Sequence, residues 1–224
     1  NRWIFASELK AFHDVPEFRP KLNRSALTSM LRFNYIPAPD TIYQGMYKLP
    51  PGHLICLEQG AEDSRPESWW TPYDAALRAK TSMFEGSDSE LVDQLETLLT
   101  DAVGIRMASD VPLGAFLSGG LDSSTVVALM QAQSSRPVQT FSIGFREAGF
   151  NEATHAKEIA AHLNTEHTEL YVTADQARDI IPLIPKYWDE PFSDSSQIPT
   201  FLVCQLARKK VTVALSGDGG DELF

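Results

Sequence analysis

The stretch Ala115-Phe116-Leu117-Ser118-Gly119-Gly120-Leu121-Asp122-Ser123-Ser124 decides the fold. It predicts the end of a buried strand, a glycine turn and the N-terminus of a helix. The two glycines let the backbone approach an anion, and the three serines add hydroxyl donors beside the free N–H groups of the helix. Asp122 would repel a phosphate unless a divalent cation lay between them. The stretch therefore predicts a nucleotide bound together with Mg²⁺.

An ordinary strand-to-helix turn is the alternative interpretation of this stretch. No Gly-Lys-Ser or Gly-Lys-Thr occurs in the chain, so transfer of a γ-phosphate by a P-loop is not the expected chemistry. A second glycine turn, Leu215-Ser216-Gly217-Asp218-Gly219-Gly220-Asp221-Glu222, follows another predicted strand. By itself it could be a flexible loop with solvated acids. If the two strands are neighbours, Asp122 and Asp221 could share one hard cation that bridges phosphates.

Composition suits a soluble globular protein of one or two domains, with 224 residues, 43% of them hydrophobic. The net charge of −11 argues against a nucleic-acid partner. No apolar run reaches the roughly 20 residues that cross a bilayer, and no signal-peptide pattern opens the chain. Cys56 and Cys204 are isolated, so we expect buried thiols and a cytoplasmic location. The histidines form no zinc-binding pair and are expected to be surface or structural residues.

Helices and strands alternate from residue 88 onward, which predicts an α/β fold with a parallel sheet and helices on both faces. A capping box at Ser87–Glu90 begins a helix over 88–108, with an apolar face at 91, 95, 98, 102 and 105. Further helices are expected over 25–33, 123–133, 152–163, 174–184 and 198–210. Strands are expected over 113–117, 138–145, 167–172 and 211–215, and another should follow the Pro50-Pro51-Gly52 turn and include Cys56. The polar stretch 71–87 is the expected linker between domains over 1–70 and 88–224.

Both glycine turns resemble signatures of the glutamine-hydrolysing asparagine synthetase family, in which the first is the PP-loop of an ATP pyrophosphatase. Four segments of 1–70 are similar to the last third of the family's glutaminase domain: Phe5–Ala11, Thr41–Gly45, Lys48–His53 and Trp69-Trp70. The resemblance implies a PP-loop domain of the adenine nucleotide α-hydrolase-like, Rossmann-like kind. An α+β N-terminal-nucleophile glutaminase domain would precede it. Because the family's N-terminal cysteine is not in the printed sequence, we expect a fragment of a longer polypeptide, incomplete as an enzyme.

The resemblance implies an ATP-dependent amide-forming ligase of asparagine biosynthesis. In the family, aspartate is activated as β-aspartyl-AMP with release of pyrophosphate, and ammonia from glutamine then gives asparagine. Two alternatives stay open: the same chemistry on another carboxylate, as in sugar-acid amidation or β-lactam and lasso-peptide ring closure, or a non-catalytic remnant. The expected partners are ATP, Mg²⁺, the carboxylate, and glutamine or ammonia, with neither nucleic acid nor membrane. A homodimer is one assembly open to the chain.

Roles for individual residues also come from the resemblance. Asp218 is the expected catalytic residue, orienting or deprotonating the incoming amine, while Asp122 and Asp221 would hold Mg²⁺. The segment Trp188–Ser196 borders the same cleft in the family, although its acids and hydroxyls alone predict only capping of the next helix. The expected contacts to ATP and pyrophosphate are Leu117, Ser118, Gly119, Gly120, Asp122, Ser123, Ser124, Ile143, Gly144, Ser216 and Gly217.

Overall fold

The structure is a computed structural model that describes residues 3–58, 64–145 and 153–221. These residues form two compact units. The first comprises the described part of 1–85 together with Pro182–Ser195, and the second comprises Gly86–Ile181 and the described residues from Ser196 onward. The domain limits expected from the sequence remain a prediction. In the described part of the chain, no helix is long and apolar enough to cross a membrane.

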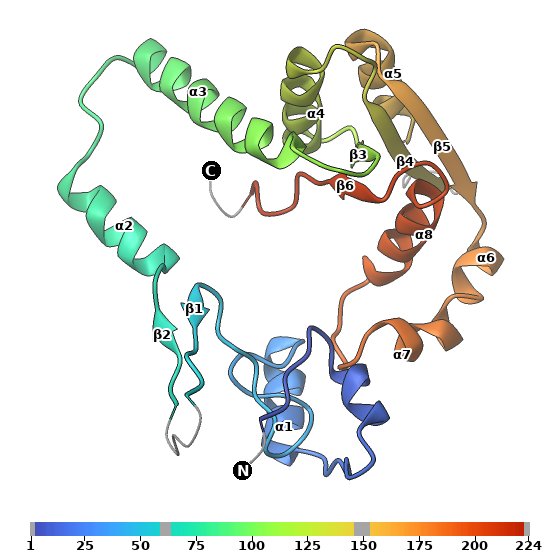
Figure 1. Ribbon diagram of the computed structural model, residues 1–224. Coiled ribbons are helices and arrows are strands. Elements are labelled where there is room, and N and C mark those ends of the chain that lie inside the picture. Colours follow the sequence, from blue (N-terminus) through green and yellow to red (C-terminus); the bar gives the residue numbers. More distant parts are fainter. Residues whose placement is uncertain (1–2, 59–63, 146–152, 222–224) are drawn as a thin grey trace. The chain divides into compact units, whose positions relative to one another are not determined.

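A parallel sheet of four strands organises the second unit, in the order β5-β4-β3-β6 (Figure 1). The strands are β3 (Leu113–Phe116), β4 (Gln139–Phe145), β5 (Glu166–Val172) and β6 (Val213–Leu215). Strands β3, β4 and β5 follow one another in one direction, and β6 then pairs with the free side of β3. The direction of winding therefore reverses between β3 and β6, where doubly wound sheets bind ligands at the carboxyl ends of the strands. This confirms the predicted α/β fold.

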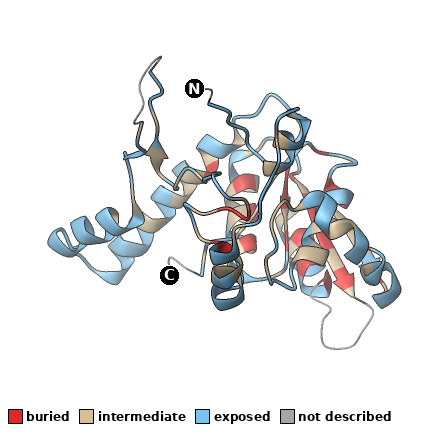
Figure 2. Cartoon of the chain, turned by 90° about the horizontal axis from the view of Figure 1, so that it is seen from below, coloured by how far each residue is buried: buried red, intermediate tan, exposed pale blue. Residues whose placement is uncertain are grey.

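Helices pack on both faces of this sheet. On one face, Ala115 and Leu117 share a buried cluster with side chains of α3 (Asp88–Met107), α4 (Leu121–Gln133) and α5 (Ala153–Leu163). On the other, Phe141 packs with Leu206 of α8 (Gln197–Ala207). Buried residues gather on these strands and the helices beside them (Figure 2). The sheet is thus held rigidly enough to position the turns at its strand ends.

Two expectations for the helices after residue 87 are wrong. The helix expected over 174–184 ends early: α6 (Ala174–Arg178) is followed by a 3-10 helix at Ile181–Leu183 and by α7 (Ile184–Tyr187). Pro182 explains the break, because proline lacks the N–H that continues a helix, whereas Pro185 lies in the first turn of α7, where proline is tolerated. The expected apolar face of α3 is also mostly outward: Leu91, Leu98 and Ile105 are exposed, whereas Val103 is buried.

The first unit is built around α1 (Arg24–Phe33), which Asn23 caps through its side chain. Ala26 packs with Ile36 and Ile42 in a small core. The strand expected after Pro50-Pro51-Gly52 is short: β1 covers only His53–Leu54 and pairs antiparallel with β2 (Glu67–Ser68). Cys56 lies outside it. Part of the expected linker forms a helix, α2 (Pro72–Thr81), with Thr71 as its cap.

Both cysteines differ from expectation in their burial. Cys56 and Cys204 are exposed free thiols rather than buried small hydrophobes. Cys56 follows the end of β1, beyond the paired residues, and Cys204 lies on an outer position of α8. Composition alone cannot reveal this, because the side of an element that faces outward depends on the packing around it.

Candidate functional site

The first glycine turn lies at the carboxyl end of β3. Leu117 is buried and donates its N–H to the carbonyl oxygen of Phe141 at 2.9 Å, so the strand stays paired up to the turn. Gly119 has φ +87°, a conformation that favours glycine. Gly120 is the N-cap of α4, and no side chain caps that helix. The first N–H groups of α4 are therefore the groups that this turn can offer to an anion.

The serine hydroxyls brace the turn from within. Ser123 Oγ accepts the N–H of Ser118 at 3.2 Å and lies 2.9 Å from Ser118 Oγ, which in turn accepts the N–H of Gly120 at 3.2 Å. Ser124 Oγ donates to the carbonyl oxygen of Gly120 at 2.6 Å. All three hydroxyls, expected from the sequence to be phosphate donors, make hydrogen bonds inside the turn. Their observed contribution is to hold the backbone in its conformation.

The second glycine turn meets the first at backbone distance. A Cβ added to Gly217 would lie 2.6 Å from the backbone N of Ser123 and 2.9 Å from the carbonyl carbon of Asp122. A Cβ added to Gly220 would lie 2.5 Å from Cγ of the Asp122 side chain. Neither position has room for a larger residue. The structure therefore brings the two motifs together at the switch point of the sheet, although about 90 residues separate them along the chain.

The acids of the two turns differ in exposure. Asp122 is half-buried beside Gly220, whereas Asp218 and Asp221 are exposed. The backbone N–H of Asp218 is held by Ser216 Oγ at 3.0 Å. Among the described residues, no group of three or more His, Cys, Asp or Glu side chains could hold a metal. Mg²⁺ usually needs only one or two carboxylates plus substrate phosphates, so the oxygen donors of Asp122 and Asp221 fit this ion.

Ile143 and Gly144 lie near the carboxyl end of β4, next to β3 in the sheet. Gly144 is buried and Ile143 is half-buried. His167 of β5 lies close to the hydroxyls of the preceding part of β4: its Nδ1 is 2.9 Å from Thr140 Oγ1 and its Nε2 is 3.1 Å from Ser142 Oγ. Burial lowers the pKa of His167. These contacts join the ring to β4, and no short pattern in the sequence predicts its hydroxyl partners.

The first turn of α5 also packs against the first glycine turn. A Cβ added to Gly119 would lie 2.9 Å from the backbone N of Ala156 and 3.0 Å from Cβ of His155. The sequence carried no signal for this contact, because it joins residues more than 30 positions apart without a recognisable motif. Gly119 thus has two requirements for glycine, its positive φ and this close approach.

The segment Trp188–Ser196 leads into α8 (Gln197–Ala207). Ser196 is the N-cap residue of α8, but its side chain makes no capping hydrogen bond. Most of the segment belongs to the first unit. Asp189 and Glu190 accept hydrogen bonds there from Lys10 and from the N–H of Ile42.

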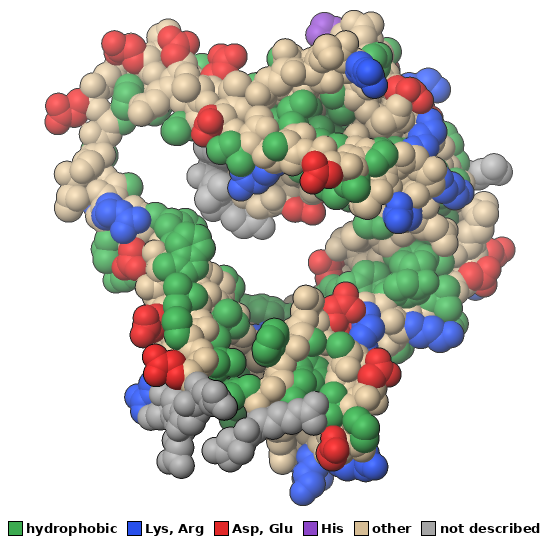
Figure 3. All heavy atoms as spheres, in the orientation of Figure 1, with side chains coloured by type: hydrophobic (Ala, Val, Ile, Leu, Met, Phe, Trp, Pro, Cys, Tyr) green, Lys and Arg blue, Asp and Glu red, His purple; other side chains and the backbone are tan. Residues whose placement is uncertain are grey.

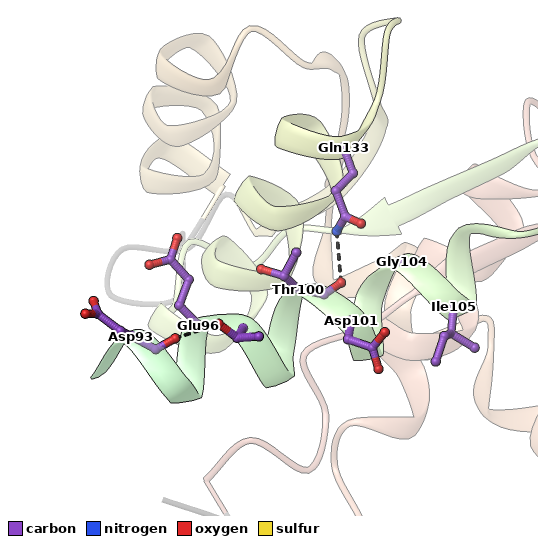
Figure 4. Close-up of a pocket in the computed structure, with 8 residues that line it drawn as sticks. Asp93, Glu96, Thr100, Asp101, Gly104, Ile105 and Gln133 are labelled. Atoms are coloured by element: carbon purple, nitrogen blue, oxygen red, sulfur yellow. Dashed lines mark hydrogen bonds between the residues drawn. The ribbon is translucent and has the colours of Figure 1, made fainter. Parts of the chain in front are cut away.

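A pocket of about 650 Å³ lies between α3 and α4 (Figure 4). Asp93, Glu96 and Asp101 line it, and Gln133 donates to the carbonyl oxygen of Thr100 at 3.1 Å. Acidic side chains gather over α3 in the space-filling view (Figure 3). The pocket contains none of the predicted site residues, and its carboxylates would repel a phosphate. The candidate site is therefore the pair of glycine turns.

The fold and these turns define a class of protein: a doubly wound α/β domain with two glycine turns meeting at its switch point. Comparison with known families makes the assignment more specific. Residues 94–224 match the family described as asparagine synthase, and residues 1–70 match the glutamine amidotransferase domain. The chain belongs to the asparagine synthase family. The family resemblance of the two glycine turns is thereby confirmed.

Individual relatives agree with this assignment. The chain is 40% identical to a putative glutamine-hydrolysing asparagine synthetase 2 of Methanocaldococcus jannaschii, with 100% of this chain and 42% of that protein covered. It is 35% identical to glutamine-hydrolysing asparagine synthetase 1 of Bacillus subtilis, with 98% and 33% covered. The chain thus spans less than half the length of these relatives. An NH3-dependent NAD synthetase structure from Campylobacter jejuni aligns with a TM-score of 0.42 and 16% identity, covering 58% of each chain.

Proposed function

We propose that this chain is part of an ATP-dependent, amide-forming ligase that makes asparagine from aspartate with ammonia drawn from glutamine. Aspartate would attack the α-phosphorus of ATP through its side-chain carboxylate, giving β-aspartyl-AMP and pyrophosphate. Ammonia would then displace AMP. The observation that carries the proposal is the contact of Gly217 and Gly220 with Asp122 and Ser123, because it joins two anion-type turns at one switch point.

In this proposal the backbone of the first turn binds the pyrophosphate part of ATP. The uncapped N-terminus of α4 supplies N–H groups and a favourable dipole. Ser118, Ser123 and Ser124 hold the turn in shape through its internal hydrogen bonds, so little reorganisation is needed when the leaving group develops charge. Leu117 and the segment Ile143-Gly144 would border the adenosine.

The carboxylates of Asp122 and Asp221 are the residues that would hold Mg²⁺. When bound, this ion would neutralise the phosphates and stabilise pyrophosphate as it leaves. Without the ion, the half-buried Asp122 would oppose a polyphosphate at the same turn. The two carboxylates would therefore favour ATP binding only when Mg²⁺ binds together with the nucleotide.

Asp218 would act in the second half-reaction. Its carboxylate is exposed, while its backbone N–H is tied to Ser216 Oγ at 3.0 Å, so the turn is restrained and the side chain stays available. We assign it to orienting the incoming amine or removing its proton, the work of a general base. Ser216 and Gly217 would contact the phosphates from the side of β6.

The experiment is isotope exchange in the full-length protein. Labelled pyrophosphate should enter ATP when aspartate and Mg²⁺ are present, and much less without aspartate. Sugar acids and other carboxylates, offered separately, test the alternative acceptors. Release of ADP and inorganic phosphate would contradict the proposed adenylation, and absence of any nucleotide chemistry would favour a non-catalytic remnant.

A further inference from the structure

The segment Pro182–Ser195, here called the strap, belongs by sequence to the synthase match over 94–224. In the structure it is part of the first unit, whose other part contains the amidotransferase match over 1–70. The strap continues at its C-terminal end into α8, which leads to β6 and the second glycine turn. One piece of synthase sequence is therefore packed with amidotransferase sequence.

Glu190 binds the strap to the small core of the first unit. Its Oε1 accepts the N–H of Ile42 at 2.6 Å, and its Oε2 pairs with Lys48 Nζ at 2.6 Å. Lys48 Nζ also donates to the carbonyl oxygen of Ile36 at 2.6 Å. Ile36 and Ile42 are both buried in that core, and the Glu190 side chain is only 17% exposed. The carboxylate is thus tied to backbone that cannot move independently of the core.

Asp189 makes a second connection of the same kind. Its Oδ2 accepts the N–H of Lys10 at 2.9 Å, and its Oδ1 pairs with Lys10 Nζ at 3.2 Å. Lys10 Nζ returns a hydrogen bond to the carbonyl oxygen of Tyr187 at 3.1 Å. Further along the strap, the N–H of Ser193 donates to the carbonyl oxygen of Asn34 at 2.7 Å. Three separate parts of 1–70 are therefore attached to one short segment.

These contacts differ from ordinary surface ion pairs, which contribute little. Both strap carboxylates are largely shielded, at 15% and 17% exposed, and each accepts a backbone N–H as well as an ammonium group. Such charge-assisted hydrogen bonds fix geometry. Removing Lys48 would leave the shielded Glu190 carboxylate without its ammonium partner, whereas Lys10 would keep its ion pair with Glu8 at 2.9 Å if Asp189 were removed.

We propose that Asp189 and Glu190 are positioning residues that couple glutamine use to amide formation. The strap would hold the amidotransferase segment, and the chain runs on from it through α8 and β6 to the turn that carries Asp218. Neither acid has a role in nucleotide binding in this proposal. The inference rests on the proposed function, since it concerns how that reaction obtains its ammonia.

The test uses the full-length protein and the variants Asp189→Asn, Glu190→Gln and Lys48→Met. Asparagine formation is measured with glutamine and, separately, with ammonia, together with glutamate released per AMP formed. The glutamine-dependent rate should fall by about tenfold or more, as expected when one partner of a shielded charge pair is removed. The ammonia-dependent rate should stay within about twofold, and the ratio of glutamate to AMP should rise. Glu17→Gln, which neutralises an exposed acid of the same unit, is the matched control and should change neither rate.

Equal losses with glutamine and ammonia would overturn the coupling role, and so would unchanged rates. If Glu190→Gln loses all activity through misfolding, Lys48→Met tests the same pair from the other side. A Lys48→Met protein that keeps a normal ratio of glutamate to AMP would also overturn it. The proposed function fails separately, if the wild-type protein forms no AMP with either nitrogen source.

Discussion

Replacing Gly217 with alanine tests whether the contact between the two glycine turns matters. The added Cβ would lie 2.6 Å from the backbone N of Ser123 and 2.9 Å from the backbone carbonyl carbon of Asp122. Backbone atoms at the start of a packed helix cannot rotate away as a side chain can. The second turn must therefore move away from the N-terminus of α4, taking Asp218 and Asp221 with it.

The expected cost is that of overpacking, about 1–3 kcal/mol of unfolding free energy. For a protein of this size or larger, that corresponds to a fall in Tm of roughly 2–10 °C. The effect on function should be larger, because misplacing reacting groups by about 1 Å can cost about 100-fold in rate. Pyrophosphate exchange should therefore decline more than stability does.

The assay combines thermal unfolding with pyrophosphate exchange on the full-length variant. Gly104→Ala is the matched control: its Cβ would also lie 2.6 Å from another atom, but that atom is Oε1 of the Gln133 side chain. A side-chain end can move, and alanine in a helix gains roughly 0.5–1 kcal/mol over glycine. If Gly217→Ala behaves like Gly104→Ala in both measurements, the turns do not act as one site.

Three further predictions concern single side chains. Asp218→Asn should keep pyrophosphate exchange and slow amide formation by roughly 10²–10⁴-fold. Asp122→Asn and Asp221→Asn should instead abolish the exchange, because each removes a proposed Mg²⁺ ligand. Equal loss of exchange in all three variants would assign Asp218 to the metal site. Cys56, an exposed free thiol beyond the end of β1, should not be the glutaminase nucleophile, so Cys56→Ala should leave glutamate release by the full-length protein unchanged; loss of that release would contradict this. Burial lowers the pKa of His167 below 6.5, so its contribution to stability is full above about pH 6.5 and is lost as pH falls towards the lowered value. His167→Gln should flatten the acid side of the stability profile, measured by denaturant midpoints, and an unchanged profile would refute the assignment.

Local patterns were sufficient for most of the α/β unit. The capping box at Ser87 and Glu90 forms as expected, and α4 and the strands β3, β4 and β5 lie within two residues of their predicted limits. These elements depend on short-range hydrogen bonds and on runs of apolar residues, which are visible in sequence. The helix expected over 174–184 ends early because Pro182 cannot continue its hydrogen bonding.

Sequence alone determined the two glycine turns, their acids and the positions along the chain of the strands that precede them, because backbone conformation and charge are local properties. Tertiary structure decided which residues share a site. Gly217 lies against Ser123 only because β6 pairs with the free side of β3. In α3, the packing of the helix against the sheet decides that Val103 is buried while Leu98 stays exposed. The hydrogen bond from the N–H of Ile42 to Glu190 was likewise decided by tertiary structure, since 148 positions separate the two residues in the chain. Contacts at that separation depend on how whole elements pack, and no short pattern in the sequence records them.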